Sequence, residues 1–507
     1  MSVNEDFDLL VIGGGINGVG IARDSAGRGL KVLLCDKGDL AGATSSASSK
    51  LIHGGLRYLE HGEFRLVRES LAERAVLLRV APHLVRPLRL VLPQGAGSRP
   101  RWLLRAGLFL YDRLGGAGIL PASQALDLRA DPLGAPLLPH VHAGFTYADC
   151  LTDDARLTIT SARDAVSRGA EIVTRTELAA ARREGGRWHA TLRRQDGGER
   201  EVAARVLVNT AGPWVLDVLA RVGLVAKARL RLVKGSHIVV PRLYDGEHAY
   251  LLQNDDRRVV FVLPFEGDFS LIGTTELPFT GDPAAARISE AEIAYFCDAV
   301  GRWFRTVPRQ ADIVWSYAGV RPLYDNRART AAAVTRDYVF EIDAEGSPVL
   351  SVFGGKLTTY RRLAEAALAR LARYLPPMGP AWTADSVLPG GHQPSPDLRR
   401  LYPFLENATA ARLAESYGTE APRILGDARS PEDLGRDFGH GLTEAELRWM
   451  IDQEWAQTAE DVLWRRSKLG LRLNPDQVRQ VATFLERSHG RQNQAVPAKA
   501  GTHPSEC

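Results

Sequence analysis

The chain has 507 residues, of which 45% are apolar and 24% are charged, as in an ordinary globular protein. This composition excludes a disordered or fibrous protein, and the length predicts about two to four domains. The net charge of +4, from 64 basic and 60 acidic residues, is too small to indicate a nucleic acid as partner. The four cysteines lie far apart, so we expect a reducing compartment and neither a disulfide framework nor a metal site.

The N-terminal sequence MSVNEDFDLLVIGGG has no basic segment and no cleavage site, so it does not predict a secretory signal peptide. No part of the chain approaches the roughly 20 apolar residues that a transmembrane helix needs. We therefore expect a protein that is soluble or lies on a membrane surface.

A strand, a glycine-rich turn, a helix and a second strand open the chain. The apolar run 7–12 predicts a buried parallel strand, and residues 16–28 have the apolar periodicity of a helix. Residues 31–35 predict the second strand, which ends at Asp36. This order predicts a right-handed βαβ unit.

The glycines between the first strand and the helix have the spacing G-x-G-x-x-G, which is typical of dinucleotide-binding sites. Gly13 allows a tight turn, Gly15 lets the backbone approach a pyrophosphate, and Gly18 lets helix and sheet pack closely. The helix N-terminus favours phosphate, and Asp36 is placed to accept a hydrogen bond from a ribose hydroxyl. The alternative is a structural glycine-rich turn in another α/β fold.

The middle of the chain predicts many strands with a few helices between them. We expect loops at 93–100 and 115–136 and helices at 64–80, 153–168, 288–305 and 357–374. Strands are expected at 171–173, within 187–210, throughout 230–275, and at 312–318, 338–343 and 349–353. Prolines and glycines between 376 and 391 predict a linker, and only helical periodicity follows it.

Two further glycine-bearing turns favour FAD over NAD as the dinucleotide. Residues 209–212 follow an apolar run, and small residues there, including Gly212, would let the chain pass close to the cofactor. Residues 352–359 place a glycine pair between a strand and a helix. That helix terminus and the charge of Lys356 would both stabilise the negative charge of a reduced flavin. The alternative is an ordinary strand-to-helix turn.

Residues 43–60, ATSSASSKLIHGGLRYLE, resemble the FAD-dependent glycerol-3-phosphate dehydrogenases of the bacterial aerobic, membrane-associated type. The same resemblance extends over most of the chain, up to about residue 490. It is carried by shorter motifs at 234–238 (KGSHI), 272–275 (IGTT), 319–323 (GVRPL), 352–359 (VFGGKLTT), 433–435 (DLG) and 437–440 (DFGH).

The resemblance implies an α/β fold of α+β composite type, with a Rossmann-like FAD domain of the glutathione-reductase or D-amino-acid-oxidase type. A mixed-sheet substrate domain and an all-α C-terminal domain complete the expected architecture. The expected segments are 1–80, 140–230 and 335–380 for the FAD domain, 81–139 and 231–334 for the substrate-binding cap, 390–490 for the helical domain and 491–507 for a disordered tail.

The resemblance also implies an activity, namely oxidation of sn-glycerol 3-phosphate to dihydroxyacetone phosphate by hydride transfer from C2 to non-covalent FAD. The electrons would pass to a membrane quinone, and the protein would be a homodimer at the cytoplasmic face of the inner membrane. An oxidase of the same fold, which uses oxygen on glycerol 3-phosphate or an amino acid, is the alternative.

The substrate joins a phosphate dianion to a secondary alcohol. Arginine suits the phosphate because its planar fork donates two parallel hydrogen bonds. The resemblance places Arg57, Tyr58, Arg321 and Lys356 in the substrate pocket. The hydroxyl proton needs a base, for which His53 and His237 are the candidates. Catalysis is thus expected from these two histidines, from Lys356, and from Arg321, which could also stabilise an alkoxide.

The residues expected to contact FAD come from the glycine-rich turns and from the 43–50 segment, which lies after the second strand. They are Gly13, Gly15, Gly18, Asp36, Thr44, Ser45, Ser49, Lys50, Gly212, Gly354, Gly355, Lys356, Leu357 and Thr358. Lysine is scarce in this chain, so Lys50, Lys234 and Lys356, which all fall within motifs, are expected to have a role.

Residues 99–113, RPRWLLRAGLFLYDR, combine arginines with large apolar side chains. Such a helix could lie in a lipid interface with its arginines on headgroup phosphates. An ordinary buried helix of the substrate domain is the alternative.

Overall fold

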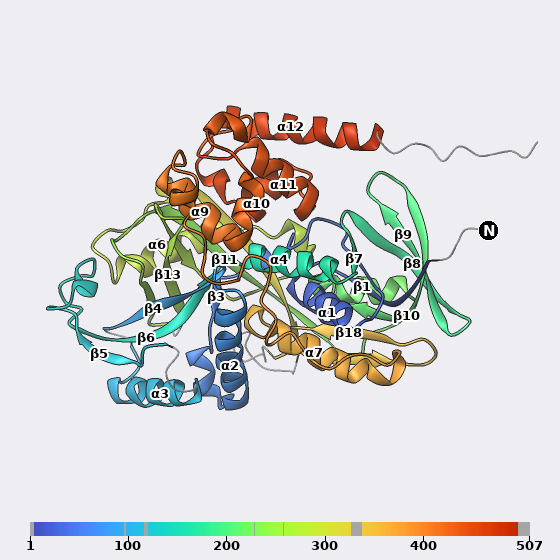
Figure 1. The fold of residues 1–507 in the computed structure, drawn as a ribbon. Helices are drawn as coiled ribbons and strands as arrows, with labels where there is room; N and C mark the ends of the chain where they lie inside the picture. The colour runs from blue at the N-terminus through green and yellow to red at the C-terminus, as the bar shows by residue number, and fades with distance from the viewer. Residues whose placement is uncertain are drawn as a thin grey trace, which may run out of the picture. The chain divides into compact units, whose positions relative to one another are not determined.

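The structure is a computed structural model that describes residues 5–95, 98–115, 120–227, 229–256, 258–325 and 337–494. The chain divides into two compact units (Figure 1). The first contains residues 1–395 and 417–419, and the second contains residues 396–416 and 420–507. Two β-sheets lie in the first unit.

The first sheet contains the predicted βαβ unit, and its central strands are parallel. In spatial order they are β18 (Val349–Phe353), β10 (Glu199–Asn209), β1 (Glu5–Ile12), β2 (Val32–Cys35) and β7 (Glu171–Val173). Three antiparallel strands extend this sheet: β17 (Val339–Asp343), β9 (Arg187–Arg194) and β8 (Thr176–Glu184). The predicted Rossmann-like arrangement is confirmed, with β1 in the middle because its apolar run is buried on both faces.

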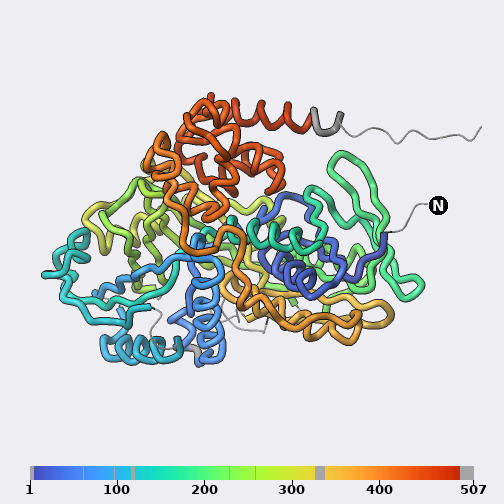
Figure 2. Tube along the Cα trace, viewed as in Figure 1, coloured from blue at the N-terminus to red at the C-terminus, as the bar shows by residue number. Residues whose placement is uncertain are grey.

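Three helices that are far apart in the sequence pack together beside this sheet. Helix α1 (Ile16–Gly27) contacts α4 (Asp154–Ser167) and α7 (Tyr360–Leu371) (Figures 1 and 2). Asp153 begins α4 because its side chain accepts a hydrogen bond from the Arg156 backbone N–H. This packing fixes the N-terminal ends of α1 and α7 near the carboxyl ends of the strands.

The second sheet is mostly antiparallel, with one parallel pair between β12 and β4, so the predicted mixed sheet is confirmed. Its strands are β3 (Leu51–Ile52), β4 (Val85–Gln94), β5 (Gln124–Asp127), β6 (Ala143–Thr152), β11 (Leu230–Pro241), β12 (Ala249–Gln253), β13 (Val259–Phe265), β14 (Phe269–Gly273), β15 (Leu277–Pro278) and β16 (Trp315–Tyr324). Strands β11 and β16 pair along ten residues and carry two of the predicted site motifs.

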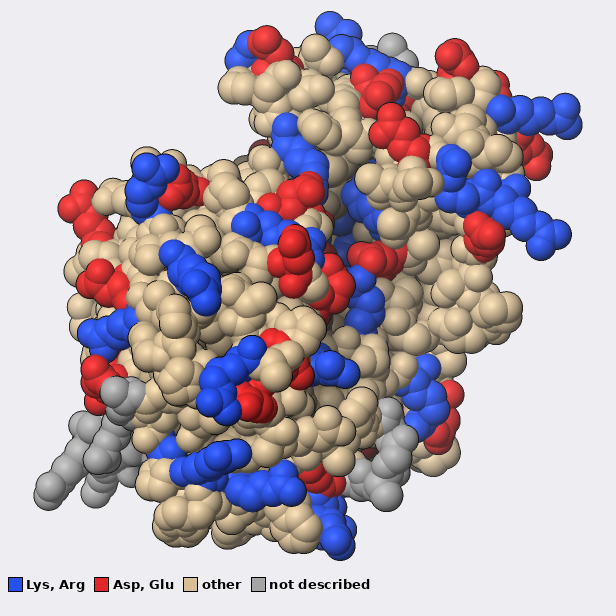
Figure 3. All heavy atoms as spheres, turned by 90° about the vertical axis from the view of Figure 1, so that its left-hand side faces the viewer, with Lys and Arg blue, Asp and Glu red and all other residues tan. Residues whose placement is uncertain are grey.

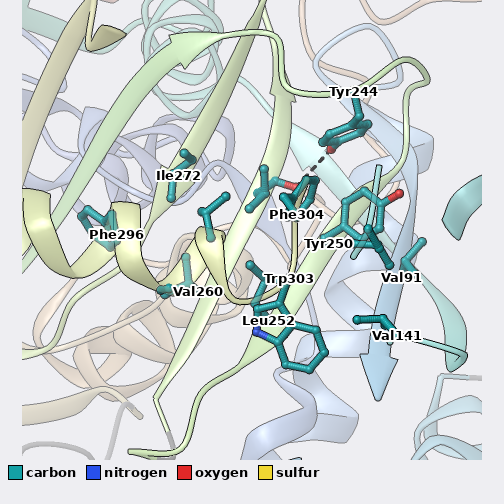
Figure 4. Close-up of a cluster of buried hydrophobic side chains, with 14 of the residues drawn as sticks. Val91, Val141, Tyr244, Tyr250, Leu252, Val260, Ile272, Phe296, Trp303 and Phe304 are labelled. Atoms are coloured by element: carbon teal, nitrogen blue, oxygen red, sulfur yellow. Dashed lines mark hydrogen bonds between the residues drawn. The ribbon is translucent and has the colours of Figure 1, made fainter. Parts of the chain in front are cut away.

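A hydrophobic core fills the space between this sheet and helix α6 (Glu290–Gly301) (Figure 4). Tyr250 and Phe304 meet edge to face there, with ring centroids 5.0 Å apart. The Tyr250 hydroxyl donates to the Leu133 carbonyl at 2.6 Å, so its polar group is satisfied inside an apolar cluster. This packing supports the second sheet, which carries the predicted site motifs on β11 and β16.

A buried carboxylate connects α6 to the second sheet. Glu292 accepts hydrogen bonds from the hydroxyls of Ser236, Thr275 and Ser289, and the Lys234 ammonium lies 2.8 Å from it. Burial would raise the pKa of Glu292, but the hydrogen bonds from Lys234, Thr275 and the other donors lower it to about 2. The charge of Lys234, from the KGSHI motif, is therefore paired with Glu292 within this network.

Replacing Glu292 by Ala should lower the free energy of unfolding by about 3 kcal/mol, because it leaves the Lys234 charge without its buried counter-ion. Chemical denaturation at neutral pH measures this loss. The pKa of the folded-state carboxyl is depressed, so the stabilisation is present above the usual 4.5 and is lost as the pH falls towards 2. Asp385→Ala, which breaks an exposed ion pair with Arg79, is the control, and an equal loss there would contradict the assignment.

The structure corrects several sequence-based boundaries. Strand β6 lies in the 140–230 segment assigned to the FAD domain, yet it pairs with β4 along ten residues of the second sheet. The strand expected at 312–318 begins at Trp315 and continues to Tyr324, because it pairs with β11 throughout. The expected loops contain the end of β4 at 93–94 and all of β5.

Helix ends also differ from the prediction. The helix expected at 288–305 is α6, which ends at Gly301. The one expected at 357–374 consists of α7 flanked by short 3₁₀ turns, Leu357–Thr359 before it and Ala372–Tyr374 after it. Propensity alone does not mark where the last turn tightens into a 3₁₀ turn.

Among the described residues of the second unit, the regular elements are helices, as predicted, apart from an isolated β-bridge between Asp437 and Thr443. Its helices are α8 (Leu398–Leu401), α9 (Asn407–Tyr417), α10 (Ala421–Leu425), α11 (Glu444–Glu454) and α12 (Pro475–Gln494), with a π-helical turn at Asp461–Arg466. The disordered tail expected from residue 491 is wrong for residues 491–494, which continue α12. Residues 495–507 lie outside the described residues.

Two surface properties bear on the expected partners. Among the described residues, no helix is both long and apolar enough to cross a membrane. On the face that Figure 3 shows, Lys and Arg side chains are interspersed with Asp and Glu, in keeping with the small net charge.

Candidate active site

The glycine-rich turn brings the end of β1 against the turn that follows β10. Gly13 has a φ of +110°, and a Cβ there would lie 2.5 Å from the Thr210 carbonyl oxygen. A Cβ on Gly18 would overlap the Gly13 carbonyl oxygen and lie 2.5 Å from Thr210 Oγ1. These contacts explain why both positions are glycine, and they keep the turn tight beneath the helix N-terminus.

Asp36 and Ser45 fix the backbone around that turn. The Asp36 carboxylate accepts hydrogen bonds from the backbone N–H groups of Gly14 at 2.6 Å and Gly38 at 2.7 Å. Burial raises the pKa of Asp36, and these N–H donors oppose that rise. Ser45 Oγ accepts from the Ile16 N–H at 2.9 Å, so the 43–50 segment folds back onto the start of α1.

The motif at 352–359 lies beside the same helix terminus. Asn17 Nδ2 donates to the Gly354 carbonyl at 3.2 Å, and a Cβ on Gly355 would lie 2.8 Å from Asn17 Nδ2. Both glycines have positive φ, 76° and 99°. Asn17 Oδ1 is buried without a hydrogen-bond partner, which a donor on a bound cofactor would satisfy. These residues therefore fit an FAD nucleotide.

Three other predicted cofactor contacts have different surroundings. Thr44 Oγ1 donates to the Val320 carbonyl at 2.6 Å and so connects the 43–50 segment to β16. The Lys50 ammonium is buried and lies 2.7 Å from Asp154 Oδ1 and 3.1 Å from the Ser46 carbonyl. The charge of Lys50 is therefore neutralised within the protein and supports the segment's conformation. Gly212, after β10, has a φ of +56°, and a Cβ there would have no other heavy atom within 4 Å.

Three predicted cations gather at one place. Arg57, on the 3₁₀ turn Leu56–His61, contacts Glu276 at 3.0 Å, and Arg321 of β16 lies 3.9 Å from the same carboxylate. The Lys356 ammonium lies 3.9 Å from the centre of the Tyr58 ring, next to Arg57 in sequence. Glu276 was not predicted as a site residue, although it directly follows the IGTT motif.

His237 lies on β11, which pairs with the strand β16 that carries Arg321. Its Nε2 is 2.9 Å from Ser49 Oγ, its ring stacks on Tyr317 at 4.7 Å, and its Nδ1 is buried without a hydrogen-bond partner. A Cβ at Gly273 would overlap this ring, so the neighbouring strand must have glycine there. Burial, and then the charges of Arg321 and Lys50, lower the pKa of His237 well below its usual value. Its imidazole is therefore neutral near pH 7.

His53, the second candidate base, is placed by its main chain. Its N–H donates to Thr358 Oγ1 at 3.3 Å, which connects the 43–60 segment to the 352–359 motif. Its ring meets Phe261 edge to face, with centroids 6.5 Å apart. The two predicted histidines thus contact different strands of the second sheet: the His53 ring contacts β13, and the His237 ring contacts β16.

Comparisons with known proteins agree with these features. A family model described as FAD dependent oxidoreductase matches residues 8–361, and one described as the C-terminal domain of alpha-glycerophosphate oxidase matches residues 381–494. The glycerol-3-phosphate dehydrogenase of Pseudomonas aeruginosa is 51% identical over 495 residues, which are 96% of this chain and 96% of the relative. The chain belongs to the FAD-dependent glycerol-3-phosphate dehydrogenase family.

Two other proteins place the chain within this dehydrogenase family. The D-erythritol 1-phosphate dehydrogenase of Brucella abortus is 50% identical over 483 residues, 93% of this chain and 96% of the relative. The glycerol-3-phosphate dehydrogenase from Bacillus halodurans, solved with FAD, superposes with a TM-score of 0.75 at 27% identity, covering 97% and 92% of the two chains. The predicted family, fold and FAD cofactor are confirmed.

Proposed function

We propose that the chain oxidises sn-glycerol 3-phosphate to dihydroxyacetone phosphate, with FAD held by the glycine-rich turns. The gathering of Arg57, Arg321 and Lys356 at one site carries this proposal, because a phosphate dianion needs fixed cations. FAD, when bound, supplies the acceptor for the hydride that leaves C2 of the substrate. The chain's own residues bind the phosphate and accept the hydroxyl proton.

The cofactor contacts that we propose are those expected from the sequence, with one change. Gly13 and Gly18 keep the turn tight, Gly15 lets the backbone approach the pyrophosphate at the N-terminus of α1, and Asp36 is held at the end of β2 to meet a ribose. The side chain of Lys50 is excluded from this set because Asp154 holds its charge. The 354–358 segment would lie against the flavin.

The hydroxyl proton is assigned to a neutral imidazole. His237 is buried, and burial and the charge of Arg321 lower its pKa, so its imidazole is neutral across the physiological range and keeps one unprotonated ring nitrogen. Arg321 lies close enough to act on this histidine, and its charge would stabilise the alkoxide as the proton leaves. His53 stays the second candidate for the base.

We propose a membrane quinone as the final electron acceptor, with an oxidase that uses oxygen as the alternative. Steady-state turnover of glycerol 3-phosphate with a soluble quinone tests both. Quinone reduction that equals substrate loss, without peroxide, supports the proposal, and peroxide that equals substrate loss supports the oxidase. D-erythritol 1-phosphate belongs in the same assay, and a higher kcat/KM for it than for glycerol 3-phosphate would contradict the proposed substrate.

We also propose that the protein is a homodimer at the cytoplasmic face of the inner membrane, bound through helix α3 (Arg101–Leu114). One face of α3 buries Leu104, Leu108 and Tyr111. The opposite face exposes Trp102 at 73% and Phe109 at 58%. Large apolar side chains and arginines on an exposed helix favour the interfacial interpretation over that of an ordinary buried helix.

The double substitution Trp102→Ala and Phe109→Ala should lower binding to anionic vesicles at low salt by at least about tenfold, because each ring removes apolar area from the interface. Vesicle sedimentation measures the change. Val225→Ala, which removes another highly exposed apolar side chain, is the matched control. If the unchanged protein does not sediment with vesicles, or the double variant sediments equally well, α3 is not the membrane contact.

A further inference from the structure

We propose that Glu276 makes the substrate site select a phosphorylated polyol over a phosphorylated acid of the same size. The inference rests on the proposed function, because it takes Arg57 and Arg321 as the groups that bind the substrate phosphate. It assigns a specificity-determining role to a residue that the known motifs do not include.

The Glu276 carboxylate lies between the two arginines. Both of its oxygens are within 3.2 Å of Arg57 Nη2, and one is 3.9 Å from Arg321 Nη1. All three side chains are largely shielded from water, with exposed fractions of 12% for Glu276, 19% for Arg57 and 24% for Arg321. Charges at these distances and this burial interact more strongly than they would at an open surface.

The backbone around Glu276 is held firmly. Thr275 is buried, and its hydroxyl donates to Glu292 at 2.7 Å and accepts from the Ser236 N–H at 3.0 Å. The next residue, Leu277, pairs with Lys234 of β11. The backbone at Glu276 is therefore held from both sides and Arg57 holds the carboxylate, so an anion that binds across the two arginines must lie next to it.

A fixed carboxylate treats hydroxyl and carboxylate groups of a ligand differently. It accepts a hydrogen bond from a hydroxyl, but it repels a second negative charge. Glycerol 3-phosphate carries hydroxyl groups within three carbons of its phosphate, whereas 3-phosphoglycerate carries a carboxylate at the same reach. Arg57 and Arg321 attract both phosphates, so the discrimination falls to Glu276.

The test compares the holoenzyme with its Glu276→Gln variant in a dye-reduction assay. The quantity measured is the ratio of the inhibition constant of 3-phosphoglycerate to the KM of glycerol 3-phosphate. This ratio should fall at least about tenfold in the variant, because the amide removes the repulsion but still accepts a hydrogen bond. Glu276→Asp keeps the charge and should change the ratio by less than about threefold.

Asp385→Asn makes the same change of charge at an exposed ion pair and should leave both constants unchanged. A parallel rise of both constants in Glu276→Gln would show that Glu276 only positions Arg57, and an unchanged ratio would show no selection; either result overturns the inference. An unchanged protein that neither oxidises nor binds glycerol 3-phosphate would instead overturn the proposed function, and this inference with it.

Discussion

Replacing Arg321 by Ala should lower kcat/KM for glycerol 3-phosphate by at least about a thousandfold while FAD stays bound. Arg321 lies on β16, in register with Val233 of β11, so its position is set by a ten-residue strand pair. Its loss would remove the cation that we propose binds the phosphate, and with it a charge that lowers the pKa of His237. The flavin contacts that we propose come from other elements, so the cofactor should be retained.

Steady-state kinetics and the flavin content of the purified variant measure both parts of this prediction. Arg302→Ala removes an exposed arginine that pairs with Asp255, and it should leave kcat/KM within about twofold. Arg321→Lys keeps the charge but loses the fork, so its activity should fall between those of the other two proteins. An unchanged kcat/KM in Arg321→Ala would remove this residue from the active site.

The second large effect is expected at the glycine-rich turn. Gly18→Ala should yield a protein that purifies without FAD and unfolds several degrees lower, because the added Cβ overlaps the Gly13 carbonyl oxygen. Moving α1 away from β1 relieves this overlap, but it also displaces the helix terminus from the proposed pyrophosphate site.

The ratio of the absorbance at about 450 nm to that at about 280 nm reports the flavin content. Thermal unfolding with and without added FAD reports the stability. Gly107→Ala is the control, because a Cβ at that position has no heavy atom within 4 Å. A yellow Gly18→Ala protein with the unchanged flavin content would contradict the proposed role of the turn.

The parts of the site that depend on local sequence could be predicted. The βαβ unit follows from an apolar run, a glycine spacing and Asp36, all within 36 residues, and each has a local physical reason. The clustering of Arg57 with Arg321 and Lys356 could be proposed only through the family resemblance, because Arg57 lies more than 260 positions before the other two.

The parts that depend on tertiary contacts could not. Glu276 lies 219 residues from Arg57, and no periodicity indicates that they pair. Lys50 and Lys234 were singled out by scarcity, which does not distinguish a ligand contact from a buried ion pair such as those with Asp154 and Glu292. The apolar pattern of β6 fits a strand of either sheet, and only its pairing with β4 assigns it to the second sheet.

The central claim is that Arg57, Arg321 and Lys356 hold a phosphorylated polyol beside a bound flavin. An anaerobic titration of the yellow protein with glycerol 3-phosphate tests it most directly. The account predicts that the flavin absorbance is bleached by about one equivalent of substrate per FAD, since one hydride reduces one flavin. A flavin spectrum that does not change with excess glycerol 3-phosphate would contradict the account.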